Sequence, residues 1–448
     1  MIMEERAAVS TPTTASRSAE LYERALKVLP GGVSRNTILR DPHPVYVASA
    51  RGCRVTDIEG VTRIDFANNM ASLVHGHSCP EIVAAVTEQL VRGTAFTLGT
   101  EVEVRYAEHM CSRTPGFDRV RFVNSGTEAV MVALKAARAF TGRPKIAKCE
   151  GAYHGLYDYV EVSQDSGPDN WGPIDRPNSV PLVHGTPPGA IDATVVIPFN
   201  DTARTLKLLD EHRDSLACVL LDLMPHRAGL VPASAEYIRE VRAWTQRHGV
   251  LLALDEVITY RSEYGGLQTR YGVTPDLTAM GKMIGGGFPI GGVAGRADVM
   301  DVLNPRAKKL LFPHAGTFSG NPISLTAGLI AMEKFDRAAI TRLNGLADRA
   351  RRGIDHAIRE TGIAACLTGA GSMFRVHMKS AAPTNHRESY PNPAEAKRMK
   401  MLLADLFDRG FVLINSGSSV LSTPMGEAEI DGLIDAMHAA FDRIAKTA

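Results

Sequence analysis

Two ionisable residues that could do chemistry together stand at the ends of two short apolar runs. Leu251–Leu254 comes directly before Asp255, and Leu277–Met280 comes shortly before Lys282. An apolar run of this length is typical of a parallel strand that is buried on both faces. Side chains at the carboxyl ends of such strands lie where open α/β sheets bind their ligands. We therefore expect an aspartate and a lysine to meet at one small ligand.

A second signal for ligand binding follows the strand candidate Val120–Val123, where residues 124–128 read NSGTE. An amphipathic helix pattern starts there and ends at Gly142. The first N–H groups of a helix that follows a strand form an anion site, to which the hydroxyls of Ser125 and Thr127 can add donors. Taken alone, the same residues also fit an ordinary helix cap.

The rest of the chain must position these residues. From about residue 120 to residue 295, strand and helix patterns alternate, which predicts crossover units and a mostly parallel sheet with flanking helices. Short strands near the N-terminus, together with helices and short strands near the C-terminus, predict a smaller α+β domain. We expect a disordered tail over residues 1–20 and the first part of the small domain over 21–75. The large domain would then cover 76–328 and the rest of the small domain 329–448.

The runs DEVITYR at 255–261 and GKMIGGGFPIGG at 281–292 resemble the cofactor centre of class III pyridoxal-phosphate (PLP) aminotransferases. The runs NSGTE and GTFSGNP, the latter at 316–322, resemble the family's phosphate-binding segments and occur in the same order. The likeness is greatest to glutamate-1-semialdehyde aminomutases and related β-amino-acid aminotransferases. It extends from about Leu21 to about Phe441 and implies an α/β fold, that of the type I PLP-dependent transferases.

The resemblance also implies a role for each matching residue. Lys282 would form a Schiff base with the cofactor aldehyde and then move a proton as a general acid–base, while Asp255 would pair with the pyridine nitrogen. The residues expected to hold the phosphate are Ser125, Gly126, Thr127 and, from a second subunit, Thr317. The last of these implies a homodimer with its site at the interface.

Four further residues are site candidates through the same resemblance. Tyr153 would stack on the cofactor ring, and Val257, which lies two residues beyond Asp255, would pack on the opposite ring face. Arg35, in the run PGGVSR, would grip a substrate carboxylate with two hydrogen bonds, and His154 would also lie at the substrate. Without the resemblance, Tyr153 would be a packing aromatic and Arg35 a solvated loop residue.

Two departures from the family pattern bear on the substrate. Asp222-Leu223 stands where the family usually has Glu-Pro, and INSGSSVL at 414–421 has neither the acid of aminomutases nor the arginine of some β-amino-acid aminotransferases. We expect an aminotransferase that moves an amino group between an α- or β-amino acid and a keto acid. The alternative is a glutamate-1-semialdehyde 2,1-aminomutase, which needs no second substrate. A non-catalytic PLP-fold binding protein is a third reading, against which the presence of both Asp255 and Lys282 argues.

Composition excludes several other classes of protein. A net charge of +1 gives no reason to expect nucleic acid as a partner, and the sequence has no apolar run long enough to cross a bilayer. The polar N-terminus lacks an apolar signal core, so we expect a cytoplasmic enzyme. Six scattered cysteines without a CxxC pair argue against a disulfide framework and against a zinc site, and no metal is expected.

Overall fold

This computed structural model describes residues 16–446, so most of the tail expected over residues 1–20 lies outside the described part. The end of that range is helical, because helix α1 (Arg17–Ala25) begins inside it. The Ser16 hydroxyl caps this helix by accepting from the N–H of Ala19, and it donates to Glu59 over 3.0 Å. A capped helix start tied to a distant carboxylate corrects the expectation of disorder for residues 16–20.

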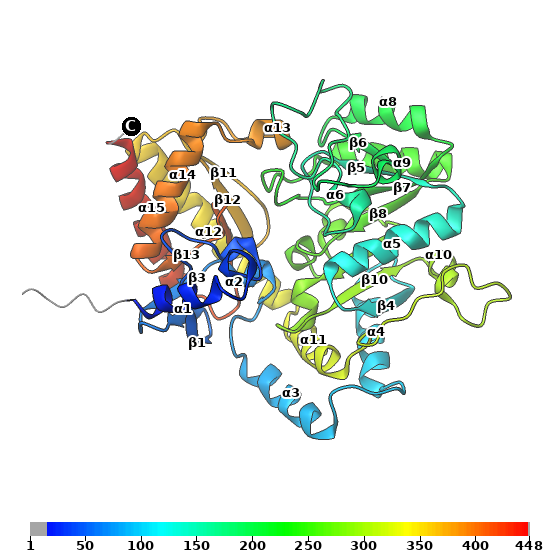
Figure 1. Ribbon diagram of the computed structural model, residues 1–448, viewed down its shortest axis with the longest axis horizontal. Helices are drawn as coiled ribbons and strands as arrows, with labels where there is room; N and C mark the ends of the chain where they lie inside the picture. The colour runs from blue at the N-terminus through cyan, green and yellow to red at the C-terminus, as the bar shows by residue number, and fades with distance from the viewer. Residues whose placement is uncertain (1–15, 447–448) are drawn as a thin grey trace, which may run out of the picture.

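A seven-stranded sheet forms the centre of the larger lobe, on the right in Figure 1. In order across the sheet its strands are β4 (Arg119–Val123), β10 (Gly291–Gly295), β9 (Leu277–Gly281), β8 (Leu251–Asp255), β7 (Leu216–Leu221), β5 (Lys145–Cys149) and β6 (Thr194–Ile197). Strand β10 is antiparallel to both of its neighbours, so β4 runs in the same direction as β9 and the strands beyond it. The mostly parallel sheet predicted from the alternating patterns is confirmed.

Helices cover both faces of this sheet. Helix α5 (Gly126–Thr141) lies on one face, and α8 (Thr202–His212) and α9 (Ala235–His248) lie on the other. Strand β8 shows the reason, because Leu251 and Ala253 share a core with α5, whereas Leu252 and Leu254 share one with α9. Successive side chains of a strand point to opposite faces, so an all-apolar strand needs cover on both.

The smaller lobe combines both ends of the chain, coloured blue and orange to red in Figure 1. One sheet contains β1 (Val47–Arg51), β2 (Arg54–Asp57), β3 (Thr62–Asp65) and β13 (Phe411–Val412), and β13 pairs parallel with β3. A second sheet contains β11 (Cys366–Thr368), β12 (Met373–His377) and β14 (Ser418–Val420). The long helices of this lobe are α12 (Arg337–Thr361), α14 (Pro393–Asp408) and α15 (Glu427–Ala445). The division of the chain at residues 20, 75 and 328 stays a prediction.

Shorter helices connect these parts. They are α2 (Asn68–Ala71), α3 (Pro80–Arg92), α4 (Glu101–Arg113), α6 (Asp158–Glu161), α7 (Pro188–Asp192), α10 (Ala297–Met300), α11 (Pro322–Lys334) and α13 (His386–Ser389). Helix α3 packs its buried Ile82 and Val86 against α11. Its remaining surface carries apolar residues, such as Leu90 and Val91, that face solvent in this single chain.

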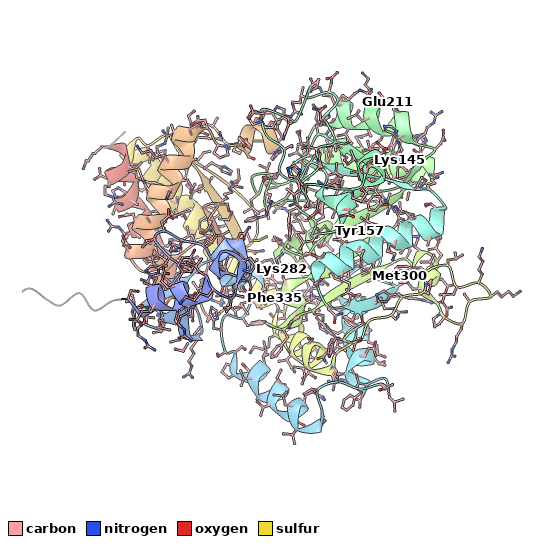
Figure 2. The ribbon with its side chains drawn as sticks, viewed as in Figure 1. Lys145, Tyr157, Glu211, Lys282, Met300 and Phe335 are labelled. Atoms are coloured by element: carbon pink, nitrogen blue, oxygen red, sulfur yellow. The ribbon has the colours of Figure 1, made fainter. Side chains whose placement is uncertain are left out.

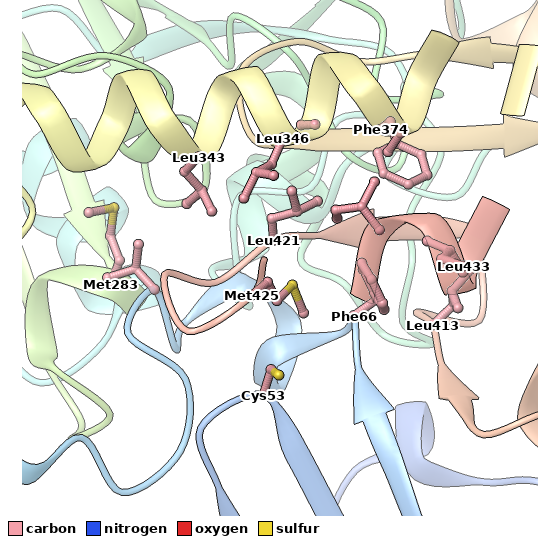
Figure 3. Packing of buried hydrophobic residues seen from close by; sticks show 14 of the residues in the cluster. Cys53, Phe66, Met283, Leu343, Leu346, Phe374, Leu413, Leu421, Met425 and Leu433 are labelled. Carbon is pink, nitrogen blue, oxygen red and sulfur yellow. The ribbon is translucent and has the colours of Figure 1, made fainter. Parts of the chain in front are cut away.

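One hydrophobic core joins the two lobes beside Lys282 (Figures 2 and 3). Figure 3 shows Leu343 and Leu346 of α12 above Leu421, with Met283 of the larger lobe at one side. Met283 directly follows Lys282 and is 1% exposed. Burying such a side chain stabilises the fold by about 1.5–3 kcal/mol, so this core holds the segment that carries the lysine.

Candidate active site

The parallel strands of the large sheet bring the predicted residues to one edge. Each of these residues stands at or just after the carboxyl end of a strand, namely Ser125 after β4, Tyr153 and His154 after β5, Asp222 after β7, Asp255 in β8 and Lys282 after β9. The direction of β4 is decisive, because an antiparallel β4 would place Ser125 at the opposite edge. This edge is the ordinary ligand-binding edge of an open α/β sheet.

Two groups hold the carboxylate of Asp255. Its Oδ2 lies 2.8 Å from Nδ1 of His154, and its Oδ1 accepts a hydrogen bond of 3.0 Å from the N–H of Val257. Burial lowers the pKa of His154 although the carboxylate of Asp255 opposes this, so the ring is neutral and donates from Nδ1. The His154 side chain is buried behind Asp255 and does not line the cavity described next. The substrate contact expected for His154 is therefore corrected to a positioning contact with Asp255.

Lys282 lines a cavity of about 610 Å³, which we call the lysine cavity. Its backbone has a φ of +50°, a left-handed conformation that is uncommon for a residue with a side chain and is often found at functional sites. Burial lowers the pKa of the lysine, while Asp255 and Asp222 oppose the shift. In Figure 2 the lysine lies at the junction between the two lobes.

Asp222 lies near Asp255 as a second buried carboxyl group. It accepts a hydrogen bond of 2.9 Å from the N–H of Met224. Burial, and next the charge of Asp255, raise the pKa of Asp222 well above its ordinary value, so Asp222 keeps its proton. The departure from the family's glutamate thus leaves a neutral acid at this strand end.

The first turn of α5 offers unpaired donors. The Ser125 hydroxyl caps the helix by accepting from the N–H of Glu128 at 3.1 Å, which leaves the first-turn N–H groups of Gly126 and Thr127 without a helical partner. Glycines allow the close packing here. A Cβ on Gly126 would lie 2.9 Å from Val257, and one on Gly155, whose φ is +97°, would lie 2.5 Å from the Thr127 hydroxyl. The free N–H groups at the start of α5, the carboxyl group of Asp255 and the amine of Lys282 together fit an aromatic aldehyde phosphate.

The remaining predicted residues fall into two groups. Tyr153 and Arg35 both line the lysine cavity, and Tyr153 has the guanidinium carbon of Arg227 at 4.9 Å from its ring centroid. Arg35 donates to Oδ1 of Asn69 over 2.8 Å. Thr317, by contrast, is exposed and does not line this cavity within one chain.

Sequence reasoning missed several residues of the cavity wall, among them Arg375 and His226. Arg375 lies in β12, and His226 lies four residues beyond Asp222. Burial lowers the pKa of His226 to about 3, and the charges of Arg375, Lys282 and Arg227 act in the same direction. For Arg375 the sequence offered one signal, which is that an arginine stands between two apolar residues, Phe374 and Val376, both of which are buried.

Comparison with known proteins agrees with this geometry. The family model for aminotransferase class-III matches residues 38–441, which is most of the chain. The chain belongs to the class III aminotransferases. This family is PLP-dependent, and PLP is an aldehyde phosphate of the kind that the site fits.

Three relatives of this class III aminotransferase are informative. It is 36% identical over 374 residues to the glutamate-1-semialdehyde 2,1-aminomutase of Methanothermobacter thermautotrophicus, covering 83% of this chain and 86% of that protein. It is 44% identical to an omega-transaminase from Sphaerobacter thermophilus, with a TM-score of 0.94 and coverage of 97% and 99%. It is 42% identical to a transaminase with PLP bound, with a TM-score of 0.88 and coverage of 96% and 98%.

Two kinds of feature are absent from residues 16–446. In that part of the enzyme no helix has the length and apolar character needed to cross a membrane. Nor do those residues contain a cluster of three or more His, Cys, Asp or Glu side chains that could bind a metal ion.

Proposed function

We propose that this enzyme transfers an amino group between an amino acid and a keto acid, and not within one molecule. The observation that carries the proposal is the wall of the lysine cavity formed by the segment 414–420. It contributes Ile414, Asn415, Ser416, Ser418 and Val420, none of which is ionisable, where an aminomutase is expected to place a glutamate. The two transaminase structures described above, at 44% and 42% identity, support the same choice.

Lys282 and Asp255 carry the chemistry in this proposal. PLP, when bound, supplies a ring that accepts the electrons released as the substrate carbon loses its proton. Lys282 would be the covalent attachment point, and its Nζ, when free, would move that proton. A lowered pKa favours the neutral amine that this step needs. Asp255 keeps the pyridine nitrogen protonated, and His154 together with the N–H of Val257 fixes the carboxylate for that contact.

The other residues hold the cofactor and the substrate. The residues that bind the phosphate are Ser125, Gly126 and Thr127 at the first turn of α5, joined by Thr317 of a second subunit. Tyr153 and Val257 cover the two ring faces. Val257 lies against Gly126, next to the first turn of α5, which supports this placement. Arg35 binds a substrate carboxylate from the mouth of the cavity.

A homodimer completes the site in this proposal. Apolar side chains on and after α3 are exposed, with Val91 87% exposed and Leu98 83% exposed, and so is Phe318 beside Thr317, at 58%. An exposed apolar surface of this kind marks an interface. Mixing Lys282→Ala and Thr317→Asp subunits tests the arrangement. If Thr317 serves the neighbouring subunit, the hybrid contains one intact site and regains activity, whereas a Thr317 that serves its own subunit allows no recovery.

We also propose a cytoplasmic location. All six cysteines are free in the structure, which suits a reducing compartment.

Absorbance spectra of the enzyme with PLP test the central proposal. We expect an absorption band of the lysine-bound cofactor, which an α-, β- or ω-amino acid bleaches with release of its keto product. Steady turnover should then require an added keto acid. Turnover of glutamate semialdehyde or diaminovalerate alone would support the second candidate, the aminomutase that the curated relative suggests. Lys282→Ala should lack the band, and a wild-type protein without it would contradict both readings.

A further inference from the structure

Arg375 is a half-buried arginine on the wall of the lysine cavity, and no acidic residue of the described part of the chain pairs with it. Its Nη1 donates to the carbonyl of His226 over 3.1 Å, and its Nε is buried with no hydrogen-bond partner in the described structure. No hydrogen bond or ion pair to a described residue uses its Nη2. A guanidinium has five N–H donors, so the edge formed by Nε and Nη2 is left free. A buried Nε–H of a cation that has no partner is costly unless a ligand pairs with it.

The neighbours of Arg375 within its sheet are neutral. It stands opposite Thr368 of β11 and Ser418 of β14 in the strand register. His377, two residues further along β12, is also uncharged, because burial, and next the charge of Arg375, lower its pKa to about 3. Burial alone lowers the pKa of Arg375 to about 10, so the side chain remains a cation at neutral pH.

Arg375 lies on the wall of the same cavity as Lys282. Arg375 also borders a second cavity of about 790 Å³, and the residues that line both cavities are Arg375, Ser389, Pro391, Asn415 and Ser416. His226, to which Nη1 is fixed, lines only the lysine cavity. Besides Lys282, the lysine cavity has three cationic residues, Arg35, Arg227 and Arg375, against two acids, Asp165 and Asp222. Of these acids Asp222 is neutral, so the cavity favours an anion.

We propose that Arg375 is the inner carboxylate anchor of this enzyme, binding the carboxylate of the amino-acid and keto-acid substrates side-on through Nε and Nη2. The inference rests on the proposed aminotransferase function and adds a residue that determines its substrate class. A planar carboxylate matches that edge with two parallel charge-assisted hydrogen bonds. Arg375 pairs with Ser418 across the strands, so it supplies from β12 the cation that the segment 414–421 lacks.

Two amino donors, one with a carboxylate and one without, test the role assigned to Arg375. We compare 3-amino-3-phenylpropanoate with 1-phenylethylamine, its decarboxylated counterpart, in the wild type, Arg375→Gln and Arg375→Lys. Arg375→Gln should lower kcat/KM for the amino acid about 100-fold, which is the loss expected for two charge-assisted hydrogen bonds. The same variant should change kcat/KM for the amine less than about threefold. Arg375→Lys keeps the charge but not the two-pronged edge, so its loss should be about tenfold.

Arg398→Gln is the matched control for structural damage. Arg398 also donates to a backbone carbonyl, that of Met378 at 3.0 Å, and its Nε also lacks a partner in the described structure, but it does not line the lysine cavity. We expect Arg398→Gln to leave kcat/KM for both donors unchanged and to shift Tm about as much as Arg375→Gln does. An equal loss for both donors in Arg375→Gln would make Arg375 merely structural and overturn the proposal, as would no loss for either.

Binding of 3-phenylpropanoate, which has the carboxylate but no amine, gives a readout that needs no turnover. Calorimetry on the PLP-loaded enzyme should show a Kd raised at least about 30-fold in Arg375→Gln. An unchanged Kd would overturn the inference. If the wild type converts neither donor but this binding depends on Arg375, the proposed function fails while the anchor stands. If the wild type converts the amino acid and Arg375→Gln does so equally well, only the anchor fails.

Discussion

His154 Nδ1 donates a hydrogen bond of 2.8 Å to Asp255 Oδ2, and the His154 side chain is buried. Because burial keeps the imidazole neutral, it orients the carboxylate without cancelling its charge. We predict that His154→Leu, which removes the donor, lowers kcat about 10- to 100-fold, the range usual for residues that orient a reacting group. His154→Asn, whose amide can still donate, should lose less. Equal losses in the two variants would contradict an orienting role, and cofactor occupancy by absorbance serves as the control.

The charge of Asp255 should matter more than its shape. Asp255→Asn keeps the size of the side chain and an oxygen for the N–H of Val257, but it removes the negative charge. We predict that PLP stays bound while kcat falls about 10²- to 10³-fold, as when a group that stabilises charge in the transition state is removed. Single-turnover absorbance with excess amino donor measures this. Near-normal turnover would show that Asp255 does not keep the pyridine nitrogen protonated.

Gly155→Ala should weaken cofactor binding through the first turn of α5. A Cβ at Gly155 would lie 2.5 Å from the Thr127 hydroxyl, and the φ of +97° adds backbone strain. We predict a Kd for PLP raised at least about tenfold, which corresponds to about 1.4 kcal/mol. Gly142→Ala, at the other end of the same helix, is the matched control, because its φ is +71° but nothing lies within 4 Å. That control should reduce Tm without changing the Kd, and an equal Kd change in both variants would exclude a local clash.

Lys148 should make stability depend on pH. It is fully buried in β5, donates to the carbonyl of Val162 over 2.8 Å, and has its pKa lowered by burial from 10.5 to about 7. The unfolded chain therefore binds a proton that the folded enzyme excludes, and this cost grows as the pH falls from 10.5 to about 7. Over that range it amounts to about 5 kcal/mol.

Lys148→Met removes this dependence. We predict that the free energy of unfolding of the variant improves relative to wild type by about 3 kcal/mol as the pH falls from about 9.5 to 7, and no further below 7. The lost hydrogen bond to Val162 lowers the stability of the variant by an amount that does not vary with pH. Denaturant unfolding across this pH range measures the difference. Lys145→Met, at the half-buried start of the same strand, should show no such slope.

Much of the site could be predicted because its signals are local. A short apolar run ending in Asp255, and the NSGTE turn that opens α5, each contain in a few neighbouring residues the strand end or helix start that positions them. The prediction of disorder up to residue 20 was wrong for residues 16–20. Hydrogen bonds to Glu59, about forty residues away in the chain, hold the start of α1, and no local pattern shows them. His154 was misplaced for a related reason. Its partner, Asp255, comes from a different strand, and no local pattern shows that the two side chains face each other.

Arg261 and Arg375 show what the sequence by itself determined and what only the tertiary structure decided. The sequence determined the family, the parallel sheet and the order of the cofactor residues, because short-range periodicity and motifs specify strands, turns and helix starts. It could not show that Arg261, within DEVITYR, is fully buried and donates to Ser372 and to the carbonyls of Ala71 and Leu421. Nor could it place Arg375 on the wall of the cavity that Lys282 also lines. Both depend on contacts between segments far apart in the chain, which form only when the two lobes pack together.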